Sequence, residues 1–272
     1  MPRINASGAD EILDKEFPVL DHGFVRLVDY MGGDARIVAA ARVSYGLGTK
    51  TVREDAALIK YLMRNEHTSP FEQVVLTFHC KMPIFVARQW IRHRTARVNE
   101  VSGRYSRLSN EYYLPDTDQL RKQSSRNKQG RSEEALPEGA RNAILGIIKR
   151  DSEAAFESYE RLLEFDLARE LARINLPLSS YTEWYWQIDL RNLFHFLKLR
   201  LSPHAQYEIR RYAEVMSEMA RKVAPTAYGA FEENILHAKR IPASVFVRLK
   251  DFLASAPDGP GEARELLKLL DE

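Results

Sequence analysis

The chain has 272 residues, of which 44% are hydrophobic and 29% are charged, a composition typical of a folded globular protein and not of a disordered one. No apolar run approaches the roughly 18 residues of a membrane span, and the N-terminal segment lacks the apolar core of a secretory signal. The net charge of +2 creates no overall field that would steer the chain to nucleic acid. We therefore expect a cytoplasmic protein that binds neither membranes nor nucleic acid.

Two details of the composition bear on function. Of the 40 basic residues 28 are arginine, whose planar guanidinium binds carboxylates, phosphates and heterocycles in a fixed fork. This excess indicates either anionic ligands or a GC-rich coding sequence, and composition does not separate the two. The single cysteine, Cys80, excludes an internal disulfide framework and is typical of a reducing compartment.

Two segments in the first half of the chain predict strands. Residues 24–31 alternate, and one face is expected to carry Phe24, Arg26, Val28 and Tyr30. Residues 73–82 alternate more clearly, and the side expected to be buried carries Val74, Leu76, Phe78, Cys80 and Met82. Because adjacent strand residues point to opposite faces, Cys80 and His79 cannot form a nucleophile–base pair, and we assign Cys80 to the core.

Helices are predicted around these strands over residues 35–44, 55–65 and 84–94. Asp34 is placed to cap the first, and Pro83 opens the third where its missing N–H is tolerated. Residues 46–51 superficially suggest a phosphate-binding loop. They lack the third glycine of a dinucleotide fingerprint and the spacing of a P-loop, so we interpret them as a flexible turn. Residues 95–106 show no period and predict a loop.

The second half of the chain is mainly helical. Residues 114–141 are polar, rich in Ser, Gln, Arg and Glu, and predict a long surface insertion. Residues 180–188 alternate as another strand, and Asp189 follows as a cap for the next helix. Helices are predicted over residues 141–165, 166–174, 190–200, 204–223 and 225–237, with one or two more after Pro242, the last over 261–270.

Few strands among many helices predict a mixed α/β (α+β) fold in which a helix-rich domain surrounds a small sheet. A doubly wound nucleotide-binding fold is not expected, because the chain shows no regular βαβ alternation. The sequence has no internal repeat, and we treat it as a single domain.

The first group of chemically active side chains surrounds the end of the helix predicted over 84–94. Its members are Gln89, Arg92, His93, Arg94, Arg97, Asn99, Glu100, Ser102, Gly103 and Arg104. Cations at a helix C-terminus complement its dipole by about 0.3–1 kcal/mol each, which accounts for Arg92 and Arg94 without any ligand. That does not account for the loop at 99–104, whose backbone N–H groups, hydroxyl and guanidinium together can hold a phosphate. Gln89 and Arg92 are three residues apart and are expected on one helix face.

A second group lies on the helix predicted over 190–200 and just beyond it: Asp189, Arg191, His195, Arg200 and His204. Arg191 and His195 are four residues apart and share a helix face. A solvated helix face capped by Asp189 is the plain alternative, and Arg173 is a third, isolated candidate. Spacing alone does not join these groups. None of the seven histidines has a second ligand at metal-binding spacing, so no metal site is expected.

Ordered motifs along the chain resemble the flavin-dependent thymidylate synthases. The triplet Arg92-His93-Arg94, followed after seven residues by Ser102, is similar to the family signature RHR(x)7S. Further segments match in family order over residues 67–72, 83–90, 99–105 and 200–208. The resemblance covers residues 20–235 approximately, and we expect residues 1–272 to form a single catalytic domain. It leaves unexplained the polar insertion at about 115–140 and a C-terminal helical extension at about 240–272.

The resemblance implies a helix-rich fold around a small sheet and a homotetramer whose four active sites are each built from several subunits. It implies reductive methylation of dUMP to dTMP, with methylenetetrahydrofolate as the carbon donor. NADPH would reduce FAD, and the reduced flavin would supply the reducing equivalents, so that tetrahydrofolate is released.

Carried over position by position, the resemblance also implies the binding residues. FAD would be surrounded by Ser44, Ser69, Glu72, Arg92, His93, Arg94, Glu100, Asp189, Arg191, His195 and His204. The nucleotide dUMP would be held by Gln89, Trp90, Ile91, Arg92, Glu100, Val101, Ser102, Gly103, Arg104, Arg173 and Arg200. His67 lies where the family has a histidine near the flavin and folate. Arg200 matches the arginine that promotes N3 ionisation of the pyrimidine, and it is the expected catalytic residue.

The chain departs from the family pattern at three positions. Arg97 stands where many members have serine, and Asp189 and His195 stand where asparagine is common. A member that binds flavin without turnover is therefore one alternative. A nucleic-acid-binding protein is another, disfavoured by the net charge of +2, and it would use the basic stretch 92–104 and the insertion's Arg121, Lys122, Arg126, Lys128 and Arg131.

Overall fold

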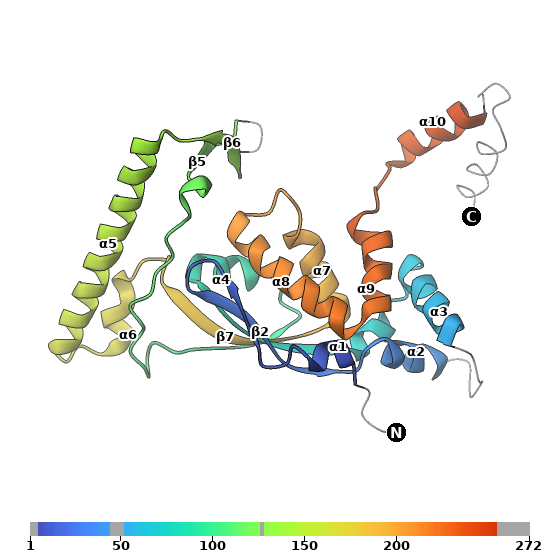
Figure 1. Ribbon diagram of the computed structural model, residues 1–272, viewed down its shortest axis with the longest axis horizontal. Helices are drawn as coiled ribbons and strands as arrows, with labels where there is room; N and C mark the ends of the chain where they lie inside the picture. The colour runs from blue at the N-terminus through green and yellow to red at the C-terminus, as the bar shows by residue number, and fades with distance from the viewer. Residues whose placement is uncertain (1–4, 44–51, 126–127, 255–272) are drawn as a thin grey trace.

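The structure, a computed structural model, describes residues 5–43, 52–125 and 128–254. Ser44, the turn expected at 46–51 and the helix expected over 261–270 lie outside the described residues. The described chain contains one five-stranded sheet, a separate two-stranded hairpin and the helices around them (Figure 1). This mixed α/β architecture, rich in helix around a small sheet, confirms the predicted fold class.

The five-stranded sheet is antiparallel throughout, in the order β1-β2-β3-β7-β4. Its strands are β1 (Glu16–Val19), β2 (Gly23–Met31), β3 (Val75–Pro83), β7 (Tyr181–Asp189) and β4 (Arg97–Glu100). The three strands predicted from alternation are confirmed as β2, β3 and β7. Strands β1 and β4 are not predicted by the pattern. All four residues of β4 are exposed at the sheet edge, so this strand shows no alternation and falls within the predicted loop.

The helices around this sheet are α1 (Ser7–Asp10), α2 (Asp34–Arg42), α3 (Val52–Arg64), the 3-10 helix η2 (Ser69–Gln73), α4 (Ile84–Trp90), α7 (Leu190–Arg200), α8 (Tyr207–Val223) and α9 (Pro225–Phe231), which continues as a π-turn (Glu232–Leu236). The ends of several helices differ from the prediction, and α3 for example begins at Val52 and not at residue 55. Helix α4 stops at Trp90 and not at Arg94, because the chain turns there to bring β4 beside β7. Helix α8 begins at Tyr207, because residues 202–205 form a turn in which the Ala205 N–H donates to the Ser202 carbonyl at 2.9 Å.

Two aspartates cap helices, one of them not as predicted. Asp189 caps α7 as expected, since its carboxylate accepts the main-chain N–H of Asn192 at 2.9 Å. The prediction that Asp34 caps its own helix is wrong. Its carboxylate instead accepts the N–H groups of Thr226 and Ala227, at 2.8 and 2.9 Å, in the first turn of α9. Asp34 therefore joins two helices that lie far apart in the sequence.

One face of the sheet is packed against helices and the other is polar, as is common for antiparallel sheets. Helices α4 and α8 lie on the packed face, and the side chains predicted to be buried there are all 0% exposed: Val74, Leu76, Phe78, Cys80 and Met82. Burial also raises the pKa of the Cys80 thiol, which fits a core role.

A β-bulge in β2 corrects the predicted strand face. The register with β3 shifts between Leu27 and Asp29, so the alternation restarts there. Tyr30 consequently lies in the core with Val25 and Leu27, and not on the face of Phe24 and Arg26.

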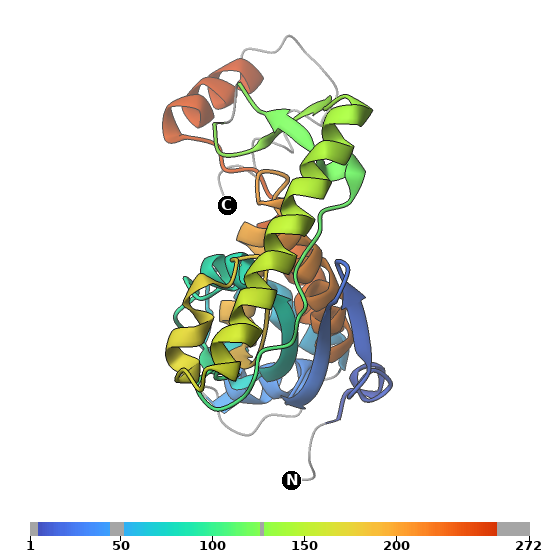
Figure 2. The same cartoon turned by 90° about the vertical axis from the view of Figure 1, so that its left-hand side faces the viewer.

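A second, smaller packing unit lies beside the sheet. The long helix α5 (Glu138–Glu164) packs against α6 (Arg169–Ala172) and a 3-10 turn (Arg173–Asn175) around Phe156 and Tyr159. The predicted insertion contains the hairpin of β5 (Arg121–Gln123) and β6 (Arg131–Ala135), preceded by a 3-10 turn (Thr117–Gln119). Figure 2 shows this hairpin near the start of α5, away from the sheet.

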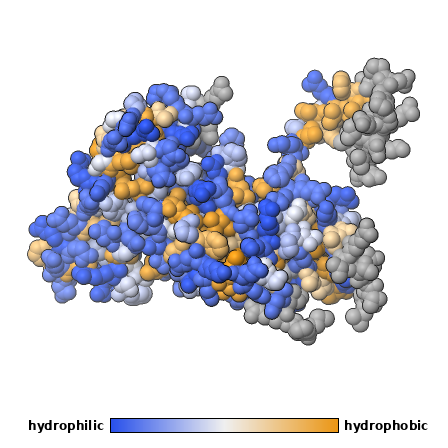
Figure 3. All heavy atoms as spheres, viewed as in Figure 1, coloured by the Kyte–Doolittle hydropathy of each residue, from blue (hydrophilic) through white to orange (hydrophobic). Residues whose placement is uncertain are grey.

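Helix α10 (Ala243–Ala254) follows the α9 segment and extends from the body of the molecule (Figure 1). Figure 3 shows apolar side chains gathered on it, and Val247 and Phe252 are 57% and 71% exposed. Within the described ranges, no helix combines the length and the apolar character needed to cross a membrane.

Candidate active site

The loop that carries Arg92, His93 and Arg94 is anchored by Trp90, the last residue of α4. The Trp90 ring is fully buried and contacts the rings of Trp184, Trp186 and Phe196. The chain leaves this anchor in a turn in which the His93 N–H donates to the Trp90 carbonyl at 3.0 Å. Because the helix has ended, the prediction that Gln89 and Arg92 share a helix face is wrong.

Arg200 joins two groups that sequence spacing could not connect. It is the last residue of α7, and its Nε donates to Nε2 of His93 at 3.1 Å. Its Nη2 also donates to the main-chain oxygen of Gln89 at 3.3 Å. The structure therefore places the expected catalytic arginine against the RHR loop of the same chain.

His93 must be neutral to accept this hydrogen bond, and its surroundings keep it so. Partial burial lowers its pKa to about 4, and electrostatic interactions with Arg200 and His195 act in the same direction. The His195 ring lies 6.0 Å from the His93 ring, centroid to centroid. Burial also lowers the pKa of Arg200. The result is a half-buried guanidinium whose direction is fixed by an uncharged imidazole.

Arg191 and His195 share one face of α7, as predicted, and open onto a cavity of about 290 Å³. The other lining residues come from α3, η2 and the connection between them, from α7 and from the segment after α9: Met63, Glu66, Thr68, Phe71, Phe194, Lys198, Ile235 and Arg240. Three guanidinium or ammonium groups and one carboxylate line it, so the cavity has an excess of positive charge and favours an anionic ligand.

Three further candidates lie on or beside η2, which contacts α7. Ser69 and Glu72 are exposed residues of η2 itself. His67 is exposed just before it, with its ring 5.9 Å from that of Tyr61. Their place next to α7 brings them to the side of the molecule that carries Arg191 and His195.

The loop from Glu100 to Arg104 is fixed at the edge of the sheet. Strand β4 pairs with β7, and the Thr182 hydroxyl donates to the Glu100 carboxylate at 2.6 Å. The Val101 N–H continues the pairing by donating to the Glu183 carbonyl at 2.9 Å. These contacts give the loop a defined start, from which Ser102 and Gly103 turn away from the sheet.

Arg173, the first residue of the 3-10 turn that follows α6, is brought to this loop. A Cβ added at Gly103 would lie 3.1 Å from Cδ and 3.2 Å from Nη1 of Arg173, so the two residues are in close contact. Arg104 pairs with Glu170 of the same helical segment at 3.1 Å. The isolated candidate Arg173 thus joins the predicted phosphate-binding loop.

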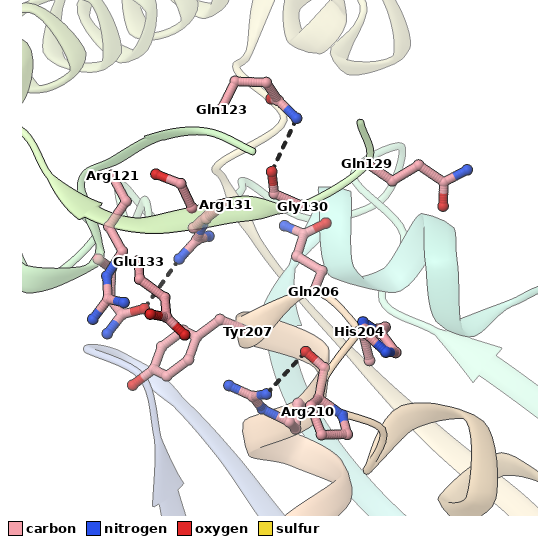
Figure 4. A pocket seen from close by; sticks show the side chains of 14 residues that line it. Arg121, Gln123, Gln129, Gly130, Arg131, Glu133, His204, Gln206, Tyr207 and Arg210 are labelled. Carbon is pink, nitrogen blue, oxygen red and sulfur yellow. Dashed lines mark hydrogen bonds between the residues drawn. The ribbon is translucent and has the colours of Figure 1, made fainter. Parts of the chain in front are cut away.

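Several expected site residues are not brought together in one chain. Arg173 contacts the Gly103 loop whereas Arg200 contacts α4, and Figure 1 shows α6 and α7 in different parts of the molecule. Arg92 and Arg94 are exposed and form no hydrogen bond or ion pair with the rest of the described chain. Ile91 and Val101 are also exposed, at 41% and 46%. His204 lies in the turn before α8 and lines a second cavity, of about 580 Å³ (Figure 4).

Gln206 and Glu208 were not predicted as site residues from the sequence, but hydrogen bonds connect them to Gln89. The side chains of Gln89 and Gln206 form a hydrogen bond, and Gln206 in turn contacts Glu208. The sequence contains a signal for Glu208, because this charged residue lies four residues before Tyr212 and therefore on the largely apolar, buried face of α8.

Comparison with known proteins shows which family the chain belongs to. The family described as "Thymidylate synthase complementing protein" matches residues 26–226. Over 247 residues the chain is 60% identical to the flavin-dependent thymidylate synthase of Treponema denticola, covering 91% of this chain and 93% of that protein. The chain belongs to the family of flavin-dependent thymidylate synthases. The chain is also 58% identical to the flavin-dependent thymidylate synthase of Treponema pallidum over 246 residues, which make up 90% of this chain and 81% of that protein.

A solved structure supports the same family relation. The UMP/dUMP methylase PolB from Streptomyces cacaoi, bound with 5-Br dUMP, superposes with a TM-score of 0.73 at 34% identity. The match covers 81% of this chain and 99% of that one. The family match includes both arginine groups and the inserted hairpin, whereas α10 lies beyond its last residue.

Proposed function

We propose that this chain is an FAD-dependent methyltransferase that makes dTMP from dUMP. Methylenetetrahydrofolate donates the carbon, NADPH donates the reducing equivalents and tetrahydrofolate is released. The observation that carries the proposal is Arg200, half-buried and held by neutral His93 in the RHR loop of a family member. A dUMP analogue bound to the similar methylase PolB supports the choice of nucleotide.

Arg200 activates the pyrimidine electrostatically. A guanidinium has five N–H donors and no acceptor, so it stays protonated and cannot act as a base. Beside the N3 position and carbonyls of uracil, it stabilises the ring anion and makes C5 a better nucleophile. Its half-buried position strengthens this effect, because less water screens the charge.

The nucleotide phosphate is bound by the Ser102–Arg104 loop together with Arg173. This loop offers main-chain N–H groups and a hydroxyl, and the contact of Arg173 with Gly103 adds a guanidinium in the same place. Gln89, Arg92 and Glu100 complete the contacts to dUMP. The chain has no cysteine suited to attack the ring, since Cys80 is fully buried.

FAD, when bound, supplies the reducing equivalents of the reaction. The residues present fit it, because the excess of cations around the cavity of about 290 Å³ complements a diphosphate. Arg191 and His195 hold the cofactor from α7, and Ser69 and Glu72 from η2. His93 and Arg94 contact it from the RHR loop.

The active enzyme is a homotetramer with shared sites, located in the cytoplasm and with residues 1–272 acting as one catalytic domain. A cavity of about 290 Å³ is at the lower limit for ligand sites of roughly 300–1,000 Å³ and is too small for a whole dinucleotide. Around the nucleotide loop, Val101, Tyr105, Leu171 and Ile174 are 46–77% exposed, as expected for a subunit contact. A neighbouring subunit would bring the Arg173 and Arg200 groups into one site.

An anaerobic experiment tests this function. The purified protein should show flavin absorbance at about 450 nm that NADPH bleaches in the absence of oxygen. Addition of methylenetetrahydrofolate and dUMP should then restore the absorbance and yield dTMP, measured by chromatography. A colourless protein that FAD does not reconstitute would contradict the proposal.

A further inference from the structure

Glu208 is a buried carboxylate in the first turn of α8, eight residues after Arg200. Its side chain is 2% exposed, and donors from three parts of the chain converge on it. Arg131 forms an ion pair with Oε1, the Tyr113 hydroxyl donates to Oε1 at 3.2 Å, and the Gln206 amide donates to Oε2 at 2.8 Å. Burial and the nearby carboxylate raise the pKa of Tyr113, which keeps its hydroxyl protonated as a donor. The network is therefore fully satisfied.

The guanidinium in this network comes from the inserted hairpin. Arg131 lies on β6, its Nη1 donates to Gln119 at 3.2 Å, and its guanidinium carbon lies 5.8 Å from the centroid of the Tyr207 ring. Figure 4 shows this side chain extending from the hairpin toward Tyr207, at the cavity of about 580 Å³ that the hairpin and residues 203–210 enclose. Among the described ion pairs of the hairpin, the Arg131–Glu208 pair is the one that reaches α8.

The contacts continue from Glu208 to the proposed active site. A carboxylate only accepts hydrogen bonds, so Gln206 turns its NH₂ group toward Glu208 and its carbonyl oxygen toward Gln89. Gln89 then donates its own NH₂ group to that oxygen. The main-chain oxygen of Gln89 accepts a hydrogen bond from Arg200 at 3.3 Å. An unbroken path of contacts thus joins the hairpin to the catalytic arginine.

We propose that Glu208 is a positioning residue for nucleotide binding and that the β5–β6 hairpin acts on the active site through it. The carboxylate fixes the amide orientation of Gln206 and Gln89, and Arg131 holds the carboxylate in place. This inference rests on the proposed function, because it takes Gln89 as a residue that binds dUMP. Breaking the path leaves the guanidinium of Arg200 in place, so dUMP binding weakens more than turnover slows.

Four variants of the holoenzyme test this path. Arg131→Met removes the ion pair from the hairpin side, and Arg131→Lys keeps the charge. The matched control is Arg121→Met, since Arg121 lies on the same hairpin and its side chain bonds the main-chain oxygen of Asp118 at 2.9 Å. Glu208→Gln keeps the side-chain shape but can present an NH₂ group to Gln206, which releases both amide orientations. The measurements are KM and kcat for dUMP, Kd for dUMP by calorimetry, flavin content and Tm.

We expect Arg131→Met and Glu208→Gln to raise KM and Kd for dUMP about tenfold, equivalent to about 1.4 kcal/mol, with kcat within about twofold of wild type. Flavin content should not change, Arg121→Met should match wild type, and Arg131→Lys should recover most of the affinity. Should Glu208→Gln fail to fold, the KM and Kd for dUMP of Arg131→Met, which changes the surface end of the path, still test the proposal.

Two results would overturn the inference. A purely structural role would lower the Tm of Arg131→Met while KM and Kd stay at wild-type values, in an enzyme that still methylates dUMP. A wild-type holoenzyme that neither binds nor methylates dUMP would overturn the proposed function as well, and this separates the two failures.

Discussion

Among single residues, His93 has the clearest electrostatic role. Its imidazole can accept the hydrogen bond from Arg200 only while it is uncharged, and burial together with Arg200 and His195 lowers its pKa to about 4. At neutral pH the ring is therefore an acceptor that directs the guanidinium, and protonation would turn it into a competing cation.

We expect His93 to titrate near pH 4 in the folded protein. A histidine in the unfolded chain has a pKa of about 6.5, so between pH 4 and pH 6.5 the unfolded state binds a proton that the folded state does not. The stabilising contribution of His93 is thus complete above about pH 6.5 and is lost as the pH falls toward 4. Proton NMR measures this pKa, with the resonance assigned by its absence in His93→Gln. A value near 6.5 would show that the ring is not held neutral.

Gly103 gives a second prediction at this scale. An alanine Cβ there would lie 3.1 Å from Cδ of Arg173 and 3.1 Å from Leu108, so the arginine must shift. We expect Gly103→Ala to weaken dUMP binding about tenfold, the loss of about 1.4 kcal/mol of contact, measured as Kd by calorimetry. Gly139→Ala is the control, because no atom lies within 4 Å of its added Cβ. Equal Kd values for the two variants would show that Arg173 does not bind the nucleotide.

Some contacts between site residues could not be found from the sequence at this scale. Arg173 and Gly103 lie 70 residues apart, and the pairing of Arg131 with Glu208 crosses 77, so no local spacing links them. The signature RHR(x)7S identifies residues within one short stretch of chain, from the turn after α4 to the loop after β4, whereas a contact between distant segments depends on the fold.

At the scale of helices and strands, prediction succeeded where a local pattern decides the structure. Alternation of apolar and polar residues predicted β3 and β7 correctly, and the capping residue Asp189 predicted the start of α7 correctly. Prediction failed where tertiary contacts decide. Strand β4 exists because β7 offers it an edge, and the bulge in β2 follows from its register with β3.

The cap of α7 gives a prediction for an element. Asp189→Ala removes the acceptor for the Asn192 N–H and should cost about 1 kcal/mol of unfolding free energy. Asp189→Asn should cost little, because asparagine is an equally good N-cap. Urea unfolding compares the three proteins. If Asp189→Ala and Asp189→Asn unfold at the same midpoint, the side-chain cap contributes nothing measurable.

At the scale of the whole molecule, the separation of the Arg173 and Arg200 groups leads to a prediction about assembly. Native mass spectrometry should find four chains of 31.3 kDa with bound FAD. Ile174 is 70% exposed beside Arg173, and Ile174→Asp should dissociate this assembly, since a charge in an apolar contact has no partner. Flavin should be lost together with the tetramer. A monomeric wild-type protein that retains FAD and activity would contradict shared sites.

The central claim is that Arg200 activates the pyrimidine, and tritium release from [5-³H]dUMP tests it most directly. With NADPH and methylenetetrahydrofolate, the wild-type enzyme should release tritium, which also separates it from a flavoprotein without turnover. Arg200→Ala should keep its fold and its flavin spectrum but lower the rate about a hundredfold or more, as when one preorganised donor to a developing anion is removed. Release by Arg200→Ala at close to the wild-type rate would contradict the account.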